Sequence, residues 1–300
     1  PIGDLRWKEP QPVVAWEGVR QCDKFGHPGY QASHLPGGYA TEWGYGDEAP
    51  YSEDCLYLNV WTKAPGQTDK KLPVALWIHG GGYITGMKEM VYMSRAAELC
   101  KKYHALIVSP GYRLAWQKPY PAAAEDCFTV LEYMSGHSDT LGYPRSALMV
   151  GGESAGGGLC AAVCMMARDR GIPVAFQMPL YPMLSNIDTA SSRDNHGRIW
   201  NTRRNHFGWR LYLRKDAKAQ VSPYSAPAQQ TDYRGLPPCY TFVGEGEPFY
   251  CETLEYVENL RRAGVEASAD VYKTDIHAFD MLYPELPVSR EAIAAFERQF

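Results

Sequence analysis

The feature that most constrains this chain is a glycine–serine turn between an apolar strand and a helix. Residues 152–156 read Gly-Glu-Ser-Ala-Gly, and the apolar run 147–150 directly precedes them. The small residues that follow predict a helix over 155–170. A serine on such a sharp strand-to-helix turn has its hydroxyl exposed above the sheet. The pattern therefore favours Ser154 as a nucleophile over a simple glycine- and serine-rich loop.

A second glycine motif follows the apolar run 74–78 and reads His-Gly-Gly-Gly-Tyr over residues 79–83. Backbone N–H groups in such a loop can stabilise the negative charge that develops on a substrate carbonyl oxygen. The expected donors of this oxyanion hole are the N–H groups of Gly81, Gly82 and Ala155. Tyr83 and Glu153 are expected to bind substrate. His79 is interpreted as structural because it lies on the oxyanion loop.

A serine hydroxyl needs a base within hydrogen-bond reach, and the base needs an orienting acid. In this type of fold the acid and then the histidine follow the serine along the chain. Of the three histidines after Ser154, His277 follows an alternating strand-like run, whereas His196 and His206 lie in an arginine-rich insert. Glu247 follows the apolar run 240–243 and is the predicted acid, with Glu245 as its competitor.

With these motifs in place, the chain resembles the α/β-hydrolase esterases of the bacterial hormone-sensitive-lipase-like family. The resemblance covers about residues 72–280 and includes the segments 79–82, 111–115, 121–126, 152–157, 222–225, 235–238 and 277–279. It implies an esterase of the α/β-hydrolase fold. The family's acid stands before a proline, which carries that role to Glu247 before Pro248, although the family usually has aspartate there.

The N-terminal part resembles a related branch, the type-B carboxylesterases. The similar segments are 1–7, 16–19 and above all 52–60, which reads Ser-Glu-Asp-Cys-Leu-Tyr-Leu-Asn-Val. Glutamate is common as the triad acid in that branch, which supports Glu247. The branch often pairs the cysteine at Cys55 with an earlier one, but the expected partner position is Gly29, so we expect no such disulfide.

Alternating strands and helices predict an α/β fold with a mostly parallel central sheet flanked by helices. We expect one α/β-hydrolase domain over residues 1–300, with a small cap formed by about 1–50 and 184–233. In open sheets of this type ligands bind at the carboxyl ends of the strands, where the four inferred site elements converge. The predicted strands are 56–62, 74–78, 105–109, 147–150, 175–180, 240–243 and 267–272, and the predicted helices include 93–103, 122–136, 155–170, 251–263 and 289–300.

The composition of the chain limits the kinds of partner that it can bind. The formal net charge is −4, and no basic footprint for nucleic acid is indicated. No apolar run approaches the roughly 18 residues of a membrane span. The eight cysteines are dispersed without metal-ligand spacing, which predicts free thiols, no metal site and a cytoplasmic location. Neither a cofactor nor an oligomeric state is indicated.

The sequence thus predicts a serine carboxylesterase that hydrolyses short-chain, acetyl-type esters of small molecules through Ser154, His277 and Glu247. A deacetylase of acylated carbohydrates and an amidase remain alternatives with the same triad, and a non-catalytic small-ligand receptor is the alternative from another class. Aromatic residues of the cap, including Trp200, either line the substrate pocket or only pack the cap. The basic stretch 193–218 is interpreted as a solvated helix face rather than a site for anionic substrates.

Overall fold

The computed structural model describes residues 3–5, 52, 58–61, 72–214, 217 and 219–300. Residues Leu58–Phe300 form one compact unit, which contains every element discussed here except the short 3-10 helix η1 (Gly3–Leu5). The predicted contribution of residues 1–50 to a cap, and the positions of Cys55 and Gly29, lie outside the described residues. That part of the cap therefore stays a prediction.

A seven-stranded sheet forms the centre of this unit, in the order β1-β3-β2-β4-β5-β6-β7. Every neighbouring pair is parallel except β1 and β3, which are antiparallel. The mostly parallel α/β-hydrolase sheet that the sequence predicts is therefore confirmed. The strands are β1 (Leu58–Trp61), β2 (Val74–Ile78), β3 (Leu106–Pro110), β4 (Leu148–Glu153), β5 (Phe176–Leu180), β6 (Cys239–Gly244) and β7 (Ala267–Tyr272).

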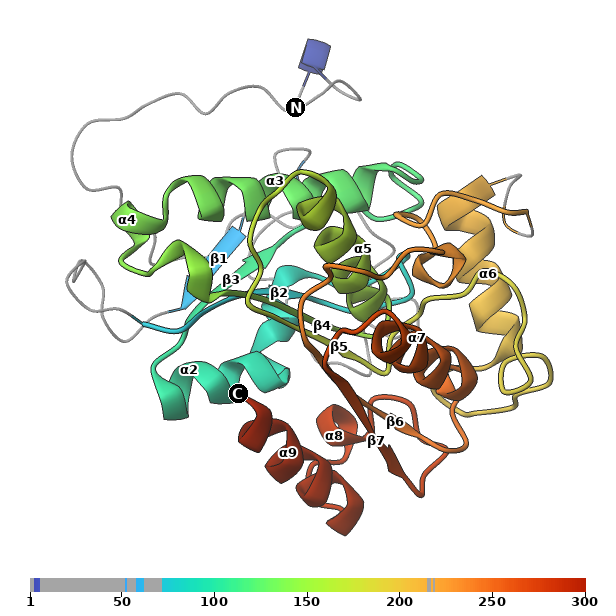
Figure 1. Cartoon of the computed structure of the whole chain (residues 1–300). Coiled ribbons are helices and arrows are strands. Elements are labelled where there is room, and N and C mark those ends of the chain that lie inside the picture. Colours follow the sequence, from blue (N-terminus) through green and yellow to red (C-terminus); the bar gives the residue numbers. More distant parts are fainter. Residues whose placement is uncertain (1–2, 6–51, 53–57, 62–71, 215–216, 218) are drawn as a thin grey trace. The chain divides into compact units, whose positions relative to one another are not determined.

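Helices cover both faces of the sheet (Figure 1). On one face lie α3 (Ala122–Gly136), α5 (Ala155–Asp169) and α7 (Tyr250–Arg262), and on the other lie α2 (Arg95–Tyr103), α8 (Phe279–Leu282) and α9 (Pro287–Gln299). The short α4 (Ser138–Leu141) follows α3, and α6 (Thr202–Leu213) lies between β5 and β6 in the chain.

Strand β2 shows how the sequence builds these layers. All five of its residues are buried, as expected for a central parallel strand that is covered on both faces. Val74, Leu76 and Ile78 join the apolar cluster under α3 and α5, whereas Ala75 and Trp77 join the cluster under α2 and α9. Side chains of a strand alternate between its faces, so one short apolar run supplies both cores.

The sheet register brings the important loops together. Val74 lies opposite Leu148 and Ile78 lies opposite Gly152, so β2 and β4 end side by side. The oxyanion-type loop after β2 is thereby placed next to the serine turn after β4.

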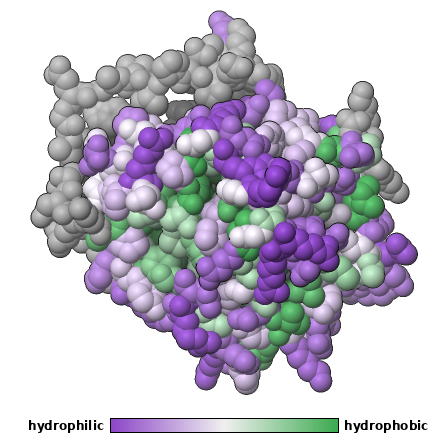
Figure 2. All heavy atoms as spheres, viewed as in Figure 1, coloured by the Kyte–Doolittle hydropathy of each residue, from purple (hydrophilic) through white to green (hydrophobic). Residues whose placement is uncertain are grey.

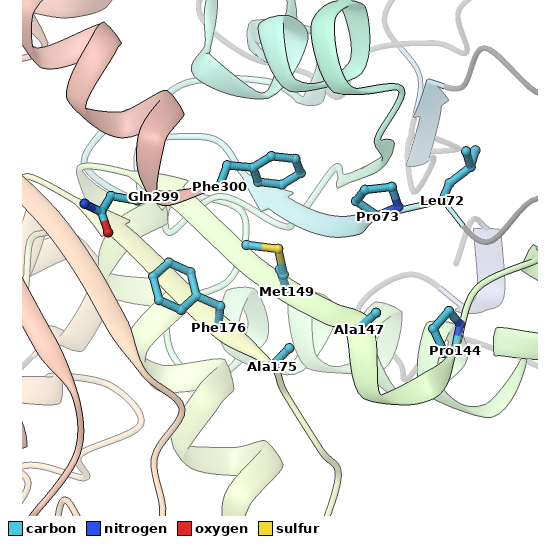
Figure 3. A pocket seen from close by; sticks show the side chains of 9 residues that line it. All are labelled: Leu72, Pro73, Pro144, Ala147, Met149, Ala175, Phe176, Gln299 and Phe300. Atoms are coloured by element: carbon cyan, nitrogen blue, oxygen red, sulfur yellow. The ribbon is translucent and has the colours of Figure 1, made fainter.

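At the amino ends of the same strands the structure has a shallow apolar pocket of about 420 Å³. Figure 3 shows its lining side chains, which come from the starts of β2, β4 and β5 and from the end of the chain. They are Leu72, Pro73, Pro144, Ala147, Met149, Ala175, Phe176, Gln299 and Phe300. This pocket lies at the end of the strands opposite to the serine turn.

The described surface is largely hydrophilic on the face shown in Figure 2, with apolar areas between polar side chains. Within the described ranges, no helix is long and apolar enough to cross a membrane. The cysteines in this part of the chain are free thiols, namely Cys100, Cys127, Cys160, Cys164, Cys239 and Cys251. The predicted cytoplasmic location stays a prediction.

Candidate active site

Ser154 occupies the turn between β4 and α5 in a strained backbone conformation, with φ 57° and ψ −120°. Few residues other than glycine adopt a positive φ, because the side chain then crowds the backbone. Such outliers persist only where the surrounding structure holds them, and they cluster at functional sites. The strain at Ser154 is what points its hydroxyl away from both the strand and the helix.

The glycines on both sides of Ser154 are required by close backbone contacts. A Cβ atom at Gly152 would lie 2.6 Å from the carbonyl oxygen of Ile78, and one at Gly156 would lie 2.0 Å from the same oxygen. Both distances are too short for any side chain. The tight turn can therefore form only because both positions lack a Cβ atom.

His277 and Glu247 complete a hydrogen-bonded chain that begins at the serine. His277 Nε2 lies 2.9 Å from Ser154 Oγ, and His277 Nδ1 lies 2.5 Å from Glu247 Oε2. The serine and the histidine are nearly buried, and the glutamate is fully buried. The geometry fits a tautomer in which Nδ1–H donates to the carboxylate while Nε2 accepts the serine proton. The structure thus brings together three residues that are far apart in the sequence.

Glu247 rather than Glu245 contacts the histidine. Glu245 lies on the turn after β6 with its side chain exposed. The second carboxylate oxygen of Glu247, Oε1, accepts a hydrogen bond of 2.7 Å from the N–H of Gly244. Burial raises the pKa of Glu247, and the hydrogen bonds from His277 and Gly244 oppose that rise. A longer acid than aspartate is accommodated because the turn folds its side chain back toward β6.

The loop after β2 lies against the serine turn. A Cβ atom at Gly80 would lie 3.2 Å from Ser154 Cβ, and Gly81 and Gly82 have φ values of 111° and 60°. In the described part of the chain, the N–H groups of Gly81, Gly82 and Ala155 have no hydrogen-bond acceptor. Unpaired N–H groups beside a serine hydroxyl are the arrangement that an oxyanion hole requires.

Trp200 covers this loop. A Cβ atom at Gly82 would lie 2.1 Å from Trp200 Cη2, so the indole lies directly on the glycine. The same ring has its centroid 6.5 Å from that of His277, and its Nε1–H points to Asn205 Oδ1 at 3.4 Å. Trp200 therefore borders both the predicted oxyanion loop and the histidine. It comes from the 184–233 insert that the sequence assigns to the cap.

Two predicted substrate-binding residues face the interior instead. Tyr83 is only 1% exposed, donates its hydroxyl proton to the carbonyl oxygen of Met183 and stacks on Tyr212. The Glu153 carboxylate accepts a 2.7 Å hydrogen bond from Trp77 Nε1, and burial raises its pKa to about 8. These contacts do not fit the prediction that the two side chains bind substrate, because both are engaged by the core.

Three other histidines that the sequence motifs bring into question, His79, His196 and His206, have structural or surface positions. His79 is buried, stacks on Tyr112 with ring centroids 4.3 Å apart, and has its pKa lowered to about 4 by burial. A neutral, stacked His79 agrees with its structural interpretation. His196 and His206 lie beside Asp194 and Asp188 on the surface of the insert, away from the serine turn.

The ring of His277 is held by aromatic neighbours that the sequence analysis does not identify. Tyr181 and Phe249 each meet it edge to face, with ring centroids 5.1 Å away. Both residues directly follow strand ends or the turns that adjoin them, β5 for Tyr181 and β6 for Phe249. Their position at the carboxyl edge of the sheet is the one signal that points to them in the sequence.

Among the described residues, no cluster of three or more His, Cys, Asp or Glu side chains is arranged to hold a metal ion. The chemistry that this geometry offers is nucleophilic. A serine hydroxyl is hydrogen-bonded to a base, the base is oriented by a buried acid, and backbone N–H groups lie nearby.

Comparisons with known proteins agree with this fold. A family model described as alpha/beta hydrolase fold matches residues 75–281, and the carboxylesterase family model matches residues 1–116. Esterase LipI of Mycobacterium tuberculosis is 29% identical over 223 residues, which are 73% of this chain and 69% of that protein. The solved structure of esterase LipW from Mycobacterium marinum superimposes with a TM-score of 0.74 at 31% identity, covering 81% of this chain and 76% of the other.

The N-terminal part has a different relative. Phenmedipham hydrolase of Pseudarthrobacter oxydans is 44% identical over 86 residues, which are 29% of this chain and 17% of that protein. This similarity and the carboxylesterase family match support the N-terminal resemblance, and the alpha/beta hydrolase family match and the esterase relatives confirm the first one.

The chain therefore belongs to the family of α/β hydrolase fold proteins. More particularly, its esterase and carboxylesterase relatives make it a carboxylic ester hydrolase of lipase-like type.

Proposed function

We propose that this protein is a serine carboxylesterase for short-chain acyl esters, with Ser154 as nucleophile, His277 as general base and Glu247 as orienting acid. The observation that carries the proposal is the continuous hydrogen-bonded path from Ser154 Oγ through His277 to Glu247. A cytoplasmic location accompanies it as the sequence-based expectation.

In the first half-reaction, His277 Nε2 takes the proton of Ser154 as Oγ forms a bond to the ester carbonyl carbon. The carbonyl π electrons move to oxygen, and the resulting oxyanion accepts hydrogen bonds from the N–H groups of Gly81, Gly82 and Ala155. Collapse of this intermediate breaks the bond to the alcohol oxygen, which leaves with the proton from His277. An acyl-Ser154 enzyme remains.

In the second half-reaction, water takes the place of the alcohol. His277 removes one water proton as the oxygen attacks the acyl carbon, and the same N–H groups stabilise the second oxyanion. Ser154 then leaves with the proton held by His277, which releases the carboxylic acid. Glu247 stays ionised and stabilises the imidazolium that forms in both halves.

Trp200 supports a short acyl group. Its indole lies on Gly82 and borders His277, so it occupies space beside the carbonyl position that the proposed oxyanion hole defines. The indole is held by its hydrogen bond to Asn205. A ring of this size leaves less room for an acyl chain than a small side chain would. We therefore infer that acetyl-type esters are preferred.

The test is hydrolysis of p-nitrophenyl esters from acetate to palmitate by the wild-type protein and by Ser154→Ala. We expect the rate to peak at short acyl chains and to fall by several orders of magnitude in the variant. Trp200→Ala should shift the optimum toward longer chains, whereas Trp116→Ala, at an exposed position, is the matched control. Turnover that survives Ser154→Ala would overturn the assignment of the nucleophile.

A further inference from the structure

A second group of buried charges lies next to the candidate site on the α2 and α8 side of the sheet. Asp280 is fully buried on α8, three residues after His277, and Arg95 is 6% exposed at the start of α2. Arg95 Nε lies 3.1 Å from Asp280 Oδ2, and Arg95 Nη2 donates to the Asp280 carbonyl oxygen at 3.3 Å. The esterase mechanism given above uses neither side chain.

Tyr181 joins this ion pair to the catalytic histidine. Its hydroxyl donates a 2.9 Å hydrogen bond to Asp280 Oδ1, while its ring meets the ring of His277 edge to face at 5.1 Å. The backbone of Tyr181 is itself fixed, because its N–H donates to the carbonyl oxygen of Phe242 and its φ is 33°. A single fully buried side chain thus touches the imidazole with one end and the carboxylate with the other.

We propose that Arg95, Asp280 and Tyr181 form a positioning unit for His277, which holds the imidazole in place and supplies buried negative charge that stabilises the imidazolium in the transition state. The inference rests on the proposed function, because it takes His277 as the base. All three side chains are buried, so their effect is assigned to His277 rather than to contact with substrate.

The physical reason is the cost of burying charge. An ion pair in a water-excluded interior is expensive to bury, and replacing it by apolar residues is often neutral or stabilising. Stability therefore gives little reason to place Arg95 and Asp280 here. A fixed carboxylate near a developing positive charge is worth far more in such an interior than in water.

The other charged groups around Asp280 do not replace this role. Glu153, on β4, is engaged by Trp77, and burial raises its pKa to about 8, so it is largely neutral at pH 7. Glu247 is already committed to His277 Nδ1. Burial also raises the pKa of Asp280, and the Arg95 guanidinium, the Tyr181 hydroxyl and the His277 ring oppose that rise. The groups that favour a charged Asp280 are thus Arg95 from α2, Tyr181 after β5 and the imidazolium of His277.

Asp280→Asn is the direct test, assayed on the intact chain with p-nitrophenyl acetate across pH. The substitution keeps the shape of the side chain but leaves Arg95 as an uncompensated buried positive charge against position 280, three residues from His277. We expect kcat to fall on the order of ten- to a hundred-fold, with KM changed little. The acid limb of the kcat/KM profile should move to lower pH, because the remaining positive charge disfavours the imidazolium.

Tyr181→Phe is the second test, since it keeps the ring against His277 and removes only the hydrogen bond to Asp280. We expect kcat to fall several-fold with the acid limb nearly unchanged, because both charges stay in place. Tyr256→Phe is the matched control: it removes an equally buried hydrogen bond, from Tyr256 to Gln177 Oε1, remote from the histidine. That variant should keep the wild-type kcat and pH profile.

Unchanged kcat and unchanged profiles in Asp280→Asn and Tyr181→Phe would overturn the inference. If Asp280→Asn does not fold, Tyr181→Phe decides alone, and a kcat equal to that of Tyr256→Phe counts against the positioning role. Failure of the proposed function has a different signature, because it appears as turnover in Ser154→Ala whatever the profiles of these variants.

Discussion

Strands β2, β4 and β5 present two very different ends. Their amino ends meet at an apolar pocket that is lined by proline, methionine and phenylalanine side chains (Figure 3). Their carboxyl ends lead into the glycine loop, into Ser154 and into Tyr181, where buried polar groups are joined by hydrogen bonds. Because the strands are parallel, one edge of the sheet gathers these reactive groups, while the shallow pocket at the other edge is lined by apolar side chains and Gln299.

The side chains of the amino-end pocket offer packing rather than an acid, a base or a nucleophile, so a hollow in the surface is not by itself a catalytic site. The carboxyl end is recognised by backbone strain, glycine contacts and paired titratable groups. Substitutions at the carboxyl ends of these strands should therefore lower activity, whereas substitutions at the amino ends should lower only stability.

The largest effect is expected for Glu247→Gln at the carboxyl end. An amide cannot stabilise the imidazolium and can favour the wrong histidine tautomer, so kcat should fall on the order of 10³- to 10⁴-fold. The measurement is the hydrolysis rate of p-nitrophenyl acetate at pH 7. Glu245→Gln, two residues away and exposed, is the control and should stay close to wild type. A larger loss in the control would reassign the acid.

Gly82→Ala should have the next largest effect. The new methyl group would collide with Trp200, and alanine is strained at the φ of 60° that Gly82 adopts. The loop must therefore move, and its N–H groups no longer point toward the oxyanion position. The loss of one oxyanion donor typically costs about 10²- to 10³-fold in kcat. Gly171→Ala is a matched control with a φ of 68° and open space around it. It should carry similar backbone strain and keep its activity, and equal losses in both variants would argue against a role for Gly82.

Glu252 allows a test by pH. Its Oε1 accepts hydrogen bonds from the N–H groups of Leu184 and Ser185, just past β5, and burial raises its pKa from 4.5 to about 8. Because the folded state binds this proton more tightly, the stability from Glu252 is full below pH 4.5 and is lost as the pH rises through about 8. Glu252→Gln should therefore lose less Tm than wild type between pH 5 and pH 8.

Thermal unfolding followed by circular dichroism at several pH values measures how Tm changes with pH in the two proteins. Between pH 5 and pH 8 the free energy of unfolding should fall by on the order of a few kcal/mol more in wild type than in Glu252→Gln, since one pKa unit corresponds to about 1.4 kcal/mol. Parallel Tm curves for wild type and variant would contradict the raised pKa.

Met149→Ala, at the amino-end pocket, should have the smallest effect. The side chain is half-buried, so its truncation should cost about 1 to 2 kcal/mol of unfolding free energy, less than for a fully buried methionine. At a temperature where the variant is folded, kcat/KM should equal that of wild type. A clear loss of kcat in the folded variant would break the contrast between the two ends of the sheet.

Local patterns predict much of this architecture. The bounds of β2, β7 and α3 follow directly from apolar runs or helical periodicity, and Ser154, His277 and Glu247 each stand in a short motif after a strand. These strands, this helix and these motifs can be predicted because the residues within one short segment determine its hydrophobic period or its turn. The arginine-rich stretch 193–218 is interpreted from the sequence as a solvated helix face without helix bounds, and α6 within it is exposed on one side while it buries Trp209, Tyr212 and Leu213 on the other.

The contacts that hold His277 are not local. Arg95, Tyr181 and Asp280 come from three elements, and the hydrogen bond between Arg95 and Asp280 spans 185 residues. Only the sheet order brings them together. Glu153 is a different case, because strand alternation places it on the same face as Met149, toward α2 and α9. That argument, applied to the sequence, would have removed it from the substrate-binding residues.

The most direct test of the account is to trap the acyl-enzyme and locate it. Wild-type protein mixed with p-nitrophenyl acetate and quenched in acid should gain the mass of one acetyl group, and peptide mapping should place that group on Ser154. His277→Ala should show little of this adduct on the same timescale. An acetyl group on another residue, or rapid turnover with no Ser154 adduct under any quench time, would contradict the Ser154–His277–Glu247 mechanism.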